Sequence, residues 1–186
     1  MRILALMWVV LGLTYSGTAQ AVPTEKQTLK DADYALRRFE EVTARIDFNR
    51  LKAPGTTIGR SQEVVLNMTQ TKYVDEAKAI LARFDGKRKP TSTELLVLMA
   101  DLERSANALL SLSDLVTNFQ DPEASPPEAA QENALAGELA TVSNTGYEAM
   151  TEVFLVLQDK IAGQEDLLKM CAQTAPPSKK KSGPSN

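Results

Sequence analysis

The chain has 186 residues, a net charge of −3 at pH 7 and no histidine. The missing imidazole excludes histidine-activated serine or cysteine nucleophiles, Glu-x-x-His di-metal sites and histidine-ligated haem or zinc. The mildly acidic, interspersed charge gives nucleic-acid binding no electrostatic support.

Residues 1–21 are predicted to form a secretory signal peptide. Arg2 supplies a positive start, residues 3–13 are almost all apolar, and Ala19-Gln20-Ala21 fits an A-x-A cleavage site. The apolar run is shorter than the roughly 20 residues that span a bilayer. We therefore expect cleavage after Ala21, bacterial-type export to the periplasm or the cell exterior, and no stable membrane anchor in the mature chain.

The first helix is expected to run from Thr24 to about Asn49. Thr24 and Gln27 have the spacing of a capping box. Pro54-Gly55 then predicts a turn. One apolar face recurs at helical spacing: Ala35, Phe39, Val42 and Ile46.

The second helix is expected from about Ser61 to Phe84. Gly86 suits the position just after a helix end, and Pro90 bars continuation. The apolar face fits a helix with one irregular step: Val65, Met68, Tyr73, Ala77, Ile80, Leu81 and Phe84.

The third helix begins at a second capping box, formed by Thr91 and Glu94. Asp121-Pro122 ends it. Its stripe alternates steps of four and three, which is typical of bundle helices that cross at about 20°. The stripe consists of Leu95, Met99, Leu102, Ala106, Leu109, Ser113 and Val116.

The last helical segment opens at Ser125, with Pro126 in the first helical position, and its apolar stripe continues to Gln173. Unbroken from 126 to 173, it would be about 72 Å long, against about 36–42 Å for the other three helices. This mismatch favours a break at Gly137 or at residues 143–146, because Gly and Asn weaken helix interiors. We expect a short helix to about Gly137, followed by a long one.

The predicted fold class is all-α, an antiparallel up-down-up-down four-helix bundle over residues 22–173, with a short extra helix before the last long helix. Residues 174–186 have the composition of a disordered Pro/Lys/Ser tail. Ser113 and Gly146 are small residues on apolar stripes. We interpret them as points where two helices approach closely; the alternative is that they line a cavity for an apolar ligand.

Cys171 is the only cysteine. It shares a stripe with Leu157, Ile161 and Leu168, which favours a packed structural thiol near the end of the last helix. An intermolecular disulfide remains an alternative, because an unpaired cysteine in an exported protein points to pairing between chains. An exposed free thiol is the third interpretation.

No catalytic, cofactor-binding or metal-binding residues are predicted, and we expect that the protein is not an enzyme. The acidic pairs are expected to be solvated, because adjacent residues on a helix point in different directions. These pairs are Glu40/Glu41, Asp101/Glu103 and Glu165/Asp166. The hypothesis that remains is an exported interaction module that binds another protein or associates with itself. The alternative is a carrier of a small apolar ligand in the bundle core.

Overall fold

The computed structural model describes residues 23–48, 58–84, 88–118 and 125–174, with side chains described for 61–84 of the second range and up to 165 in the last. These residues form helices and turns and contain no strand, which confirms the all-α class. The elements are α2 (Glu25–Thr43), α3 (Ile58–Thr69), the π-helical turn η1 (Gln70–Val74), α4 (Asp75–Leu81), α5 (Ser92–Asn118) and α6 (Pro126–Thr174).

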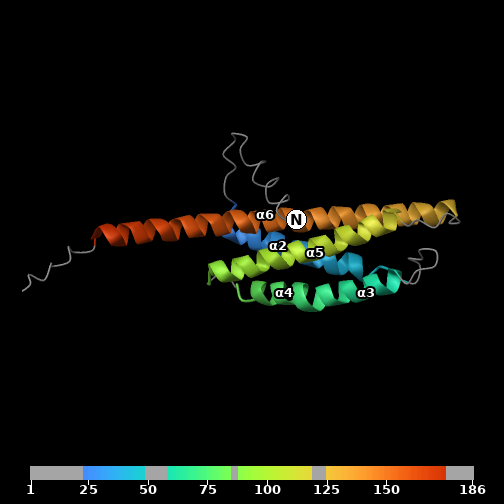
Figure 1. The fold of residues 1–186 in the computed structure, drawn as a ribbon, viewed down its shortest axis with the longest axis horizontal. Coiled ribbons are helices and arrows are strands. Elements are labelled where there is room, and N and C mark those ends of the chain that lie inside the picture. The colour runs from blue at the N-terminus through green and yellow to red at the C-terminus, as the bar shows by residue number, and fades with distance from the viewer. Residues whose placement is uncertain (1–22, 49–57, 85–87, 119–124, 175–186) are drawn as a thin grey trace, which may run out of the picture.

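The longest helix, α6, runs along one side of the molecule (Figure 1). α5 and α2 both pack against α6, and the α5–α6 interface is the most extensive. α3, η1 and α4 follow one another along the side of α5 and α2 that faces away from α6.

α2 begins as expected and ends earlier than expected. The Thr24 side chain accepts a hydrogen bond from the Gln27 amide at 3.3 Å. The Gln27 side chain instead donates to Asp31, so only half of the capping box forms. The helix ends at Thr43 rather than near Asn49, because the amides of Arg45 and Ile46 bond three residues back and tighten the chain into a turn. This turn still places Ile46 in the core.

The second predicted helix contains a π-helical turn, and the apolar face before this turn lies one residue later in the sequence than predicted. Leu66 is 3% exposed and Val74 is fully buried, whereas Val65 and Met68 are 44% and 51% exposed. The prediction that Val65 and Met68 face the core is therefore wrong. A five-residue step exists, but it joins Thr69 to Val74, because η1 accommodates the extra residue there.

α5 matches its prediction closely. The Glu94 amide donates to Thr91 Oγ1 at 3.2 Å, and the Thr91 amide donates to Glu94 Oε2 at 2.9 Å, so the capping box is complete. Six of the predicted stripe residues are buried, and Met99 packs against the core from a half-buried position. The buried ones are Leu95, Leu102, Ala106, Leu109, Ser113 and Val116.

α6 is one continuous helix of 49 residues, so the predicted break and short extra helix are wrong. Gly137 is exposed, and its carbonyl accepts a hydrogen bond from Thr141 Oγ1 at 2.8 Å. A glycine costs a helix only about 1 kcal/mol relative to alanine, which tertiary packing easily outweighs. The length mismatch is accommodated differently, because α6 extends past the other helices (Figure 1).

The part of α6 that extends past the other helices explains why a second prediction was wrong. Ile161, predicted on the buried stripe, is 44% exposed, and residues 161–165 are all exposed. One residue earlier, Lys160 Nζ donates to the Pro90 carbonyl, two residues before α5 begins. The stripe therefore passes the end of its partner helix at this point and has nothing from α5 to pack against.

Candidate functional site

Two serines, one on α5 and one on α6, each bind the backbone of the facing helix. Ser113 Oγ donates to the Ala136 carbonyl at 2.9 Å, and Ser143 Oγ donates to the Ala106 carbonyl at 2.8 Å. The residue numbers run in opposite order along the two helices, so α5 and α6 are antiparallel. Both hydroxyls are buried, and a buried hydroxyl needs such a partner.

Gly146 lies one helical turn after Ser143, where α6 packs closely against Ala106 of α5. A Cβ atom at this position would lie 3.0 Å from the Ala106 Cβ, which is tighter than normal packing. The close-packing interpretation of Ser113 and Gly146 is thus confirmed. The space beside Gly146 is already occupied by α5.

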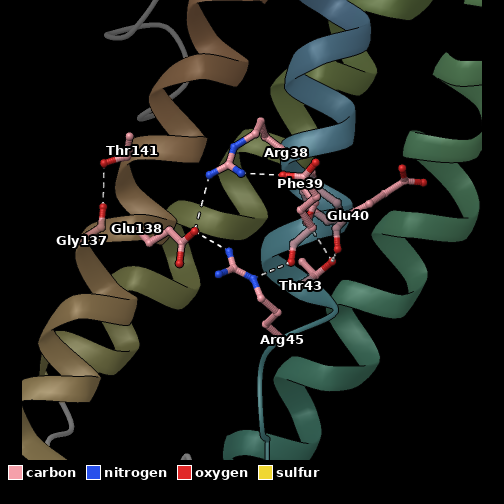
Figure 2. Close-up of polar contacts among 9 residues, drawn as sticks. Arg38, Phe39, Glu40, Thr43, Arg45, Gly137, Glu138 and Thr141 are labelled. Carbon is pink, nitrogen blue, oxygen red and sulfur yellow. Dashed lines mark hydrogen bonds and ion pairs between the residues drawn. The ribbon is translucent and has the colours of Figure 1, made fainter.

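Charged side chains fix α2 against α6 at both ends of their contact. Figure 2 shows Arg38 and Arg45 converging on Glu138, with Arg38 Nη2 3.5 Å from Glu138 Oε1. At the other end, Lys160 Nζ lies 3.8 Å from Glu25 Oε2. Such partly exposed pairs contribute about 1 kcal/mol or less each, so they set the alignment of the helices rather than form a reactive centre.

A hollow of about 230 Å³ lies at this second end. It is smaller than the roughly 300–1,000 Å³ of typical ligand pockets. Lys160, one of its two lysines, already contacts Glu25 and the Pro90 carbonyl. The lining is mostly charged and does not suit an apolar ligand: Pro23, Glu25, Lys89, Val156, Asp159 and Lys160.

Asp101 of α5 is a buried carboxylate, which corrects the expectation that it is solvated. Its side chain is 1% exposed, and its one ion pair joins Oδ1 to Arg104 Nη1 at 3.1 Å. The other oxygen, Oδ2, has no hydrogen-bond partner among the described residues. Burial, followed by the nearby charge of Glu76, raises the pKa of Asp101 to about 6. Helical spacing from Leu98 to Ser105 could have indicated this position, since both of those residues are buried.

The carboxyl groups of Asp31 in α2 and Glu152 in α6 lie close to each other across the α2–α6 interface. Burial and then the charge of Asp31 raise the pKa of Glu152, with a smaller contribution from Glu148. Gln27 Nε2 donates to both Asp31 oxygens at 2.9 Å, which holds that carboxylate in place. In the described part of the chain, no group of three or more metal-ligating side chains is placed to hold a metal ion.

Three large apolar side chains are exposed together on α3, and we call them the α3 face: Val64, Val65 and Met68. These side chains are 54%, 44% and 51% exposed. Met68 follows Val64 by four residues and Val65 by three, and both spacings make neighbours on a helix surface, so the three side chains form one apolar surface. The sequence pattern did not reveal this surface, because the predicted apolar face placed Val65 and Met68 in the core.

Several sequence predictions fall on residues whose side chains or backbone the structure does not describe. The backbone of Cys171 belongs to α6, but its side chain lies outside the described residues. The signal peptide at 1–21 and the tail from 175 onward also lie outside them. Within the described ranges, no helix is both long and apolar enough to cross a bilayer.

Comparison of the chain with family models, with curated proteins and with solved structures found no match.

Proposed function

We propose that this protein is an exported, non-enzymatic helical module that binds another protein or a second copy of itself through the α3 face. The exposed side chains of Val64, Val65 and Met68 carry this proposal. Covering apolar surface contributes about 25 cal/mol for each Å² removed from water, so a partner gains affinity by covering this face. Export rests on the predicted signal peptide at 1–21.

The architecture that we infer for this module is the antiparallel up-down-up-down four-helix bundle. The α5–α6 serine contacts support it, since they pair residues in opposite order. The α2–α6 ion pairs support it in the same way, because Glu25 pairs with Lys160 while Arg45 pairs with Glu138. In such a bundle α3 lies at an outer edge, which leaves its apolar face open to a partner.

The alternative function, a carrier of a small apolar ligand, has less support. The described hollow is small and mostly charged, and close helix packing at Gly146 explains the small residues that first suggested a cavity. Catalysis likewise has little support from the residue types, because the chain has no histidine to activate a nucleophile. Among the described residues, neither the buried carboxyl group of Asp101 nor the half-buried one of Glu152 adjoins such a nucleophile–base pair.

Site-specific photo-crosslinking tests the proposal. A benzophenone amino acid replaces Met68 in one variant and Glu103, an exposed residue of α5, in the control. Both full-length proteins are produced in their native host and irradiated there. We expect one discrete crosslinked species from position 68 and none from position 103, and mass spectrometry of that species identifies a second copy or another protein.

A substitution makes the experiment decisive. Replacing Val64 and Val65 by serine should abolish the crosslink at position 68 while the thermal unfolding temperature changes little, because both side chains are exposed. A crosslink that persists in this variant, or an identical pattern from position 103, would show that the α3 face is not the binding surface.

A further inference from the structure

The segment Ile58–Leu81, which we call the arm, consists of α3, η1 and α4 and packs on α5 and α2. Figure 1 shows it on the opposite side of these helices from α6. Its buried side chains are apolar except for Thr69, and they include Leu66, Val74, Ala77 and Ile80. The carboxylate of Asp101, on α5, lies at this contact: Glu76 of α4 is close to it, and its ion-pair partner Arg104 lies over Tyr73 of η1.

The surroundings of Asp101 do not satisfy an ionised carboxylate. Arg104 is its only ion-pair partner among the described residues, and the Arg104 side chain is half exposed to solvent. The same guanidinium lies over the ring of Tyr73 in η1, with its carbon 4.7 Å from the ring centroid. Oδ2 of Asp101 is left buried without a hydrogen bond, and leaving a buried polar group unpaired is unfavourable.

The charged groups of the neighbouring elements do not relieve this arrangement. α4 brings Glu76 close to Asp101, and two like charges oppose each other. The lysine of α4, Lys78, is committed elsewhere, because its Nζ lies 2.7 Å from Glu40 Oε2 of α2. Gln70 of η1 donates to the same Glu40 side chain at 3.0 Å.

We propose that the arm is a pH-responsive element, which docks firmly on α5 when Asp101 is protonated and loosens when Asp101 is ionised. A neutral carboxyl group removes the repulsion with Glu76 and the desolvated charge, while the apolar contacts of the arm stay the same. The proposed pH response requires only groups that lie at the contact between the arm and α5. It stands independently of the binding role of the α3 face, although that face belongs to the arm and would move with it.

The direction of the effect follows from proton linkage. The pKa of Asp101 is about 6 with the arm docked, against an ordinary value of 3.8. The docked form therefore binds the proton more tightly, so docking strengthens as the pH falls through 6 and weakens as the pH rises through 6. A difference of about two pKa units changes the docking equilibrium on the order of 50-fold between pH 7.5 and pH 4.

Hydrogen exchange of the full-length protein tests the proposal. Amide protection in α4, corrected for the intrinsic pH dependence of exchange, should rise on the order of 50-fold from pH 7.5 to pH 4. In Asp101→Asn this difference should largely disappear, with high protection at both pH values. As a matched control, Glu152→Gln alters an acid at the α2–α6 interface and should leave the pH response of α4 intact.

A second variant separates titration from a merely structural role. Glu76→Gln keeps Asp101 and removes the opposing charge, so α4 should still respond to pH, with a midpoint below that of the wild type. The carboxyl carbon of Asp101, followed by NMR, should titrate near pH 6 in the wild type and lower in this variant. Titration of Asp101 near its ordinary value, or equal α4 protection at both pH values in the wild type, would overturn the proposal.

Discussion

Ser143 of α6 donates a hydrogen bond of 2.8 Å to the carbonyl oxygen of Ala106 in α5, across 37 residues of sequence. The hydroxyl is fully buried, so it has no access to bulk water as an alternative partner. Together with the matching bond from Ser113 to Ala136, it restricts α5 and α6 to one alignment. A sliding movement of either helix would leave two buried hydroxyls unpaired.

Ser143→Ala should destabilise the protein by about 1 kcal/mol, the usual contribution of a buried hydrogen bond. Ser113→Ala should have a similar effect. The two sites are seven residues apart on each helix, or about 10 Å, so their effects should add in the double variant. Urea unfolding monitored by circular dichroism measures all three, and a double variant no less stable than either single one would contradict independent bonds.

Gly146→Leu should destabilise the protein by about 1–3 kcal/mol, because Ala106 already lies where the new side chain must go. Gly137→Leu is the matched control on the same helix. A Cβ atom at Gly137 would meet nothing within 4 Å, so the higher helix propensity of leucine should stabilise that variant by about 0.5–1 kcal/mol. Opposite shifts in the urea midpoint are expected, and shifts of the same sign would disprove the close approach at Gly146.

Leu66→Ala and Val65→Ala test the position of the π-helical turn. Leu66 is 3% exposed, and truncating a buried leucine costs about 2–5 kcal/mol. Val65 is 44% exposed, and its truncation should change stability by about 0.5 kcal/mol or less. The apolar face predicted from the sequence, which places Val65 in the core, requires the reverse order. Thermal unfolding of the two variants thus distinguishes the two alignments.

Glu152→Gln should stabilise the protein at pH 7.5, on the order of 0.5 kcal/mol, and have a smaller effect near pH 4. Burial and Asp31 raise the folded-state pKa of Glu152 above its ordinary 4.5, so its stabilising protonation is complete at low pH and lost as the pH rises through the folded-state value. Glutamine stays neutral at every pH. Glu63→Gln, which changes an exposed acid on α3, should not reproduce this pH-dependent difference in unfolding temperature.

Sequence periodicity predicted the helices correctly wherever the backbone keeps regular α-helical geometry. The Thr91–Glu94 cap and the stripe of α5 illustrate this, because local spacing determines both. Periodicity indicated one irregular step in the second helix but placed it between Met68 and Tyr73 instead of between Thr69 and Val74, because a π turn has no distinctive composition. It also failed at Gly137, where tertiary packing carries the helix through a weak position. Asp101 was missed because its residue type indicated solvent, although its spacing indicated the core.

The length of α6 has a consequence for how the molecule moves in solution. Its 49 residues extend about 74 Å, while the 27 residues of α5 extend about 40 Å. A rigid rod of 74 Å has by itself a radius of gyration of about 21 Å, larger than the about 16 Å of a compact chain of 186 residues. The protein should therefore tumble anisotropically. The backbone N–H bonds of α6 point along the long axis. In ¹⁵N relaxation they should reorient more slowly than N–H bonds that are perpendicular to this axis.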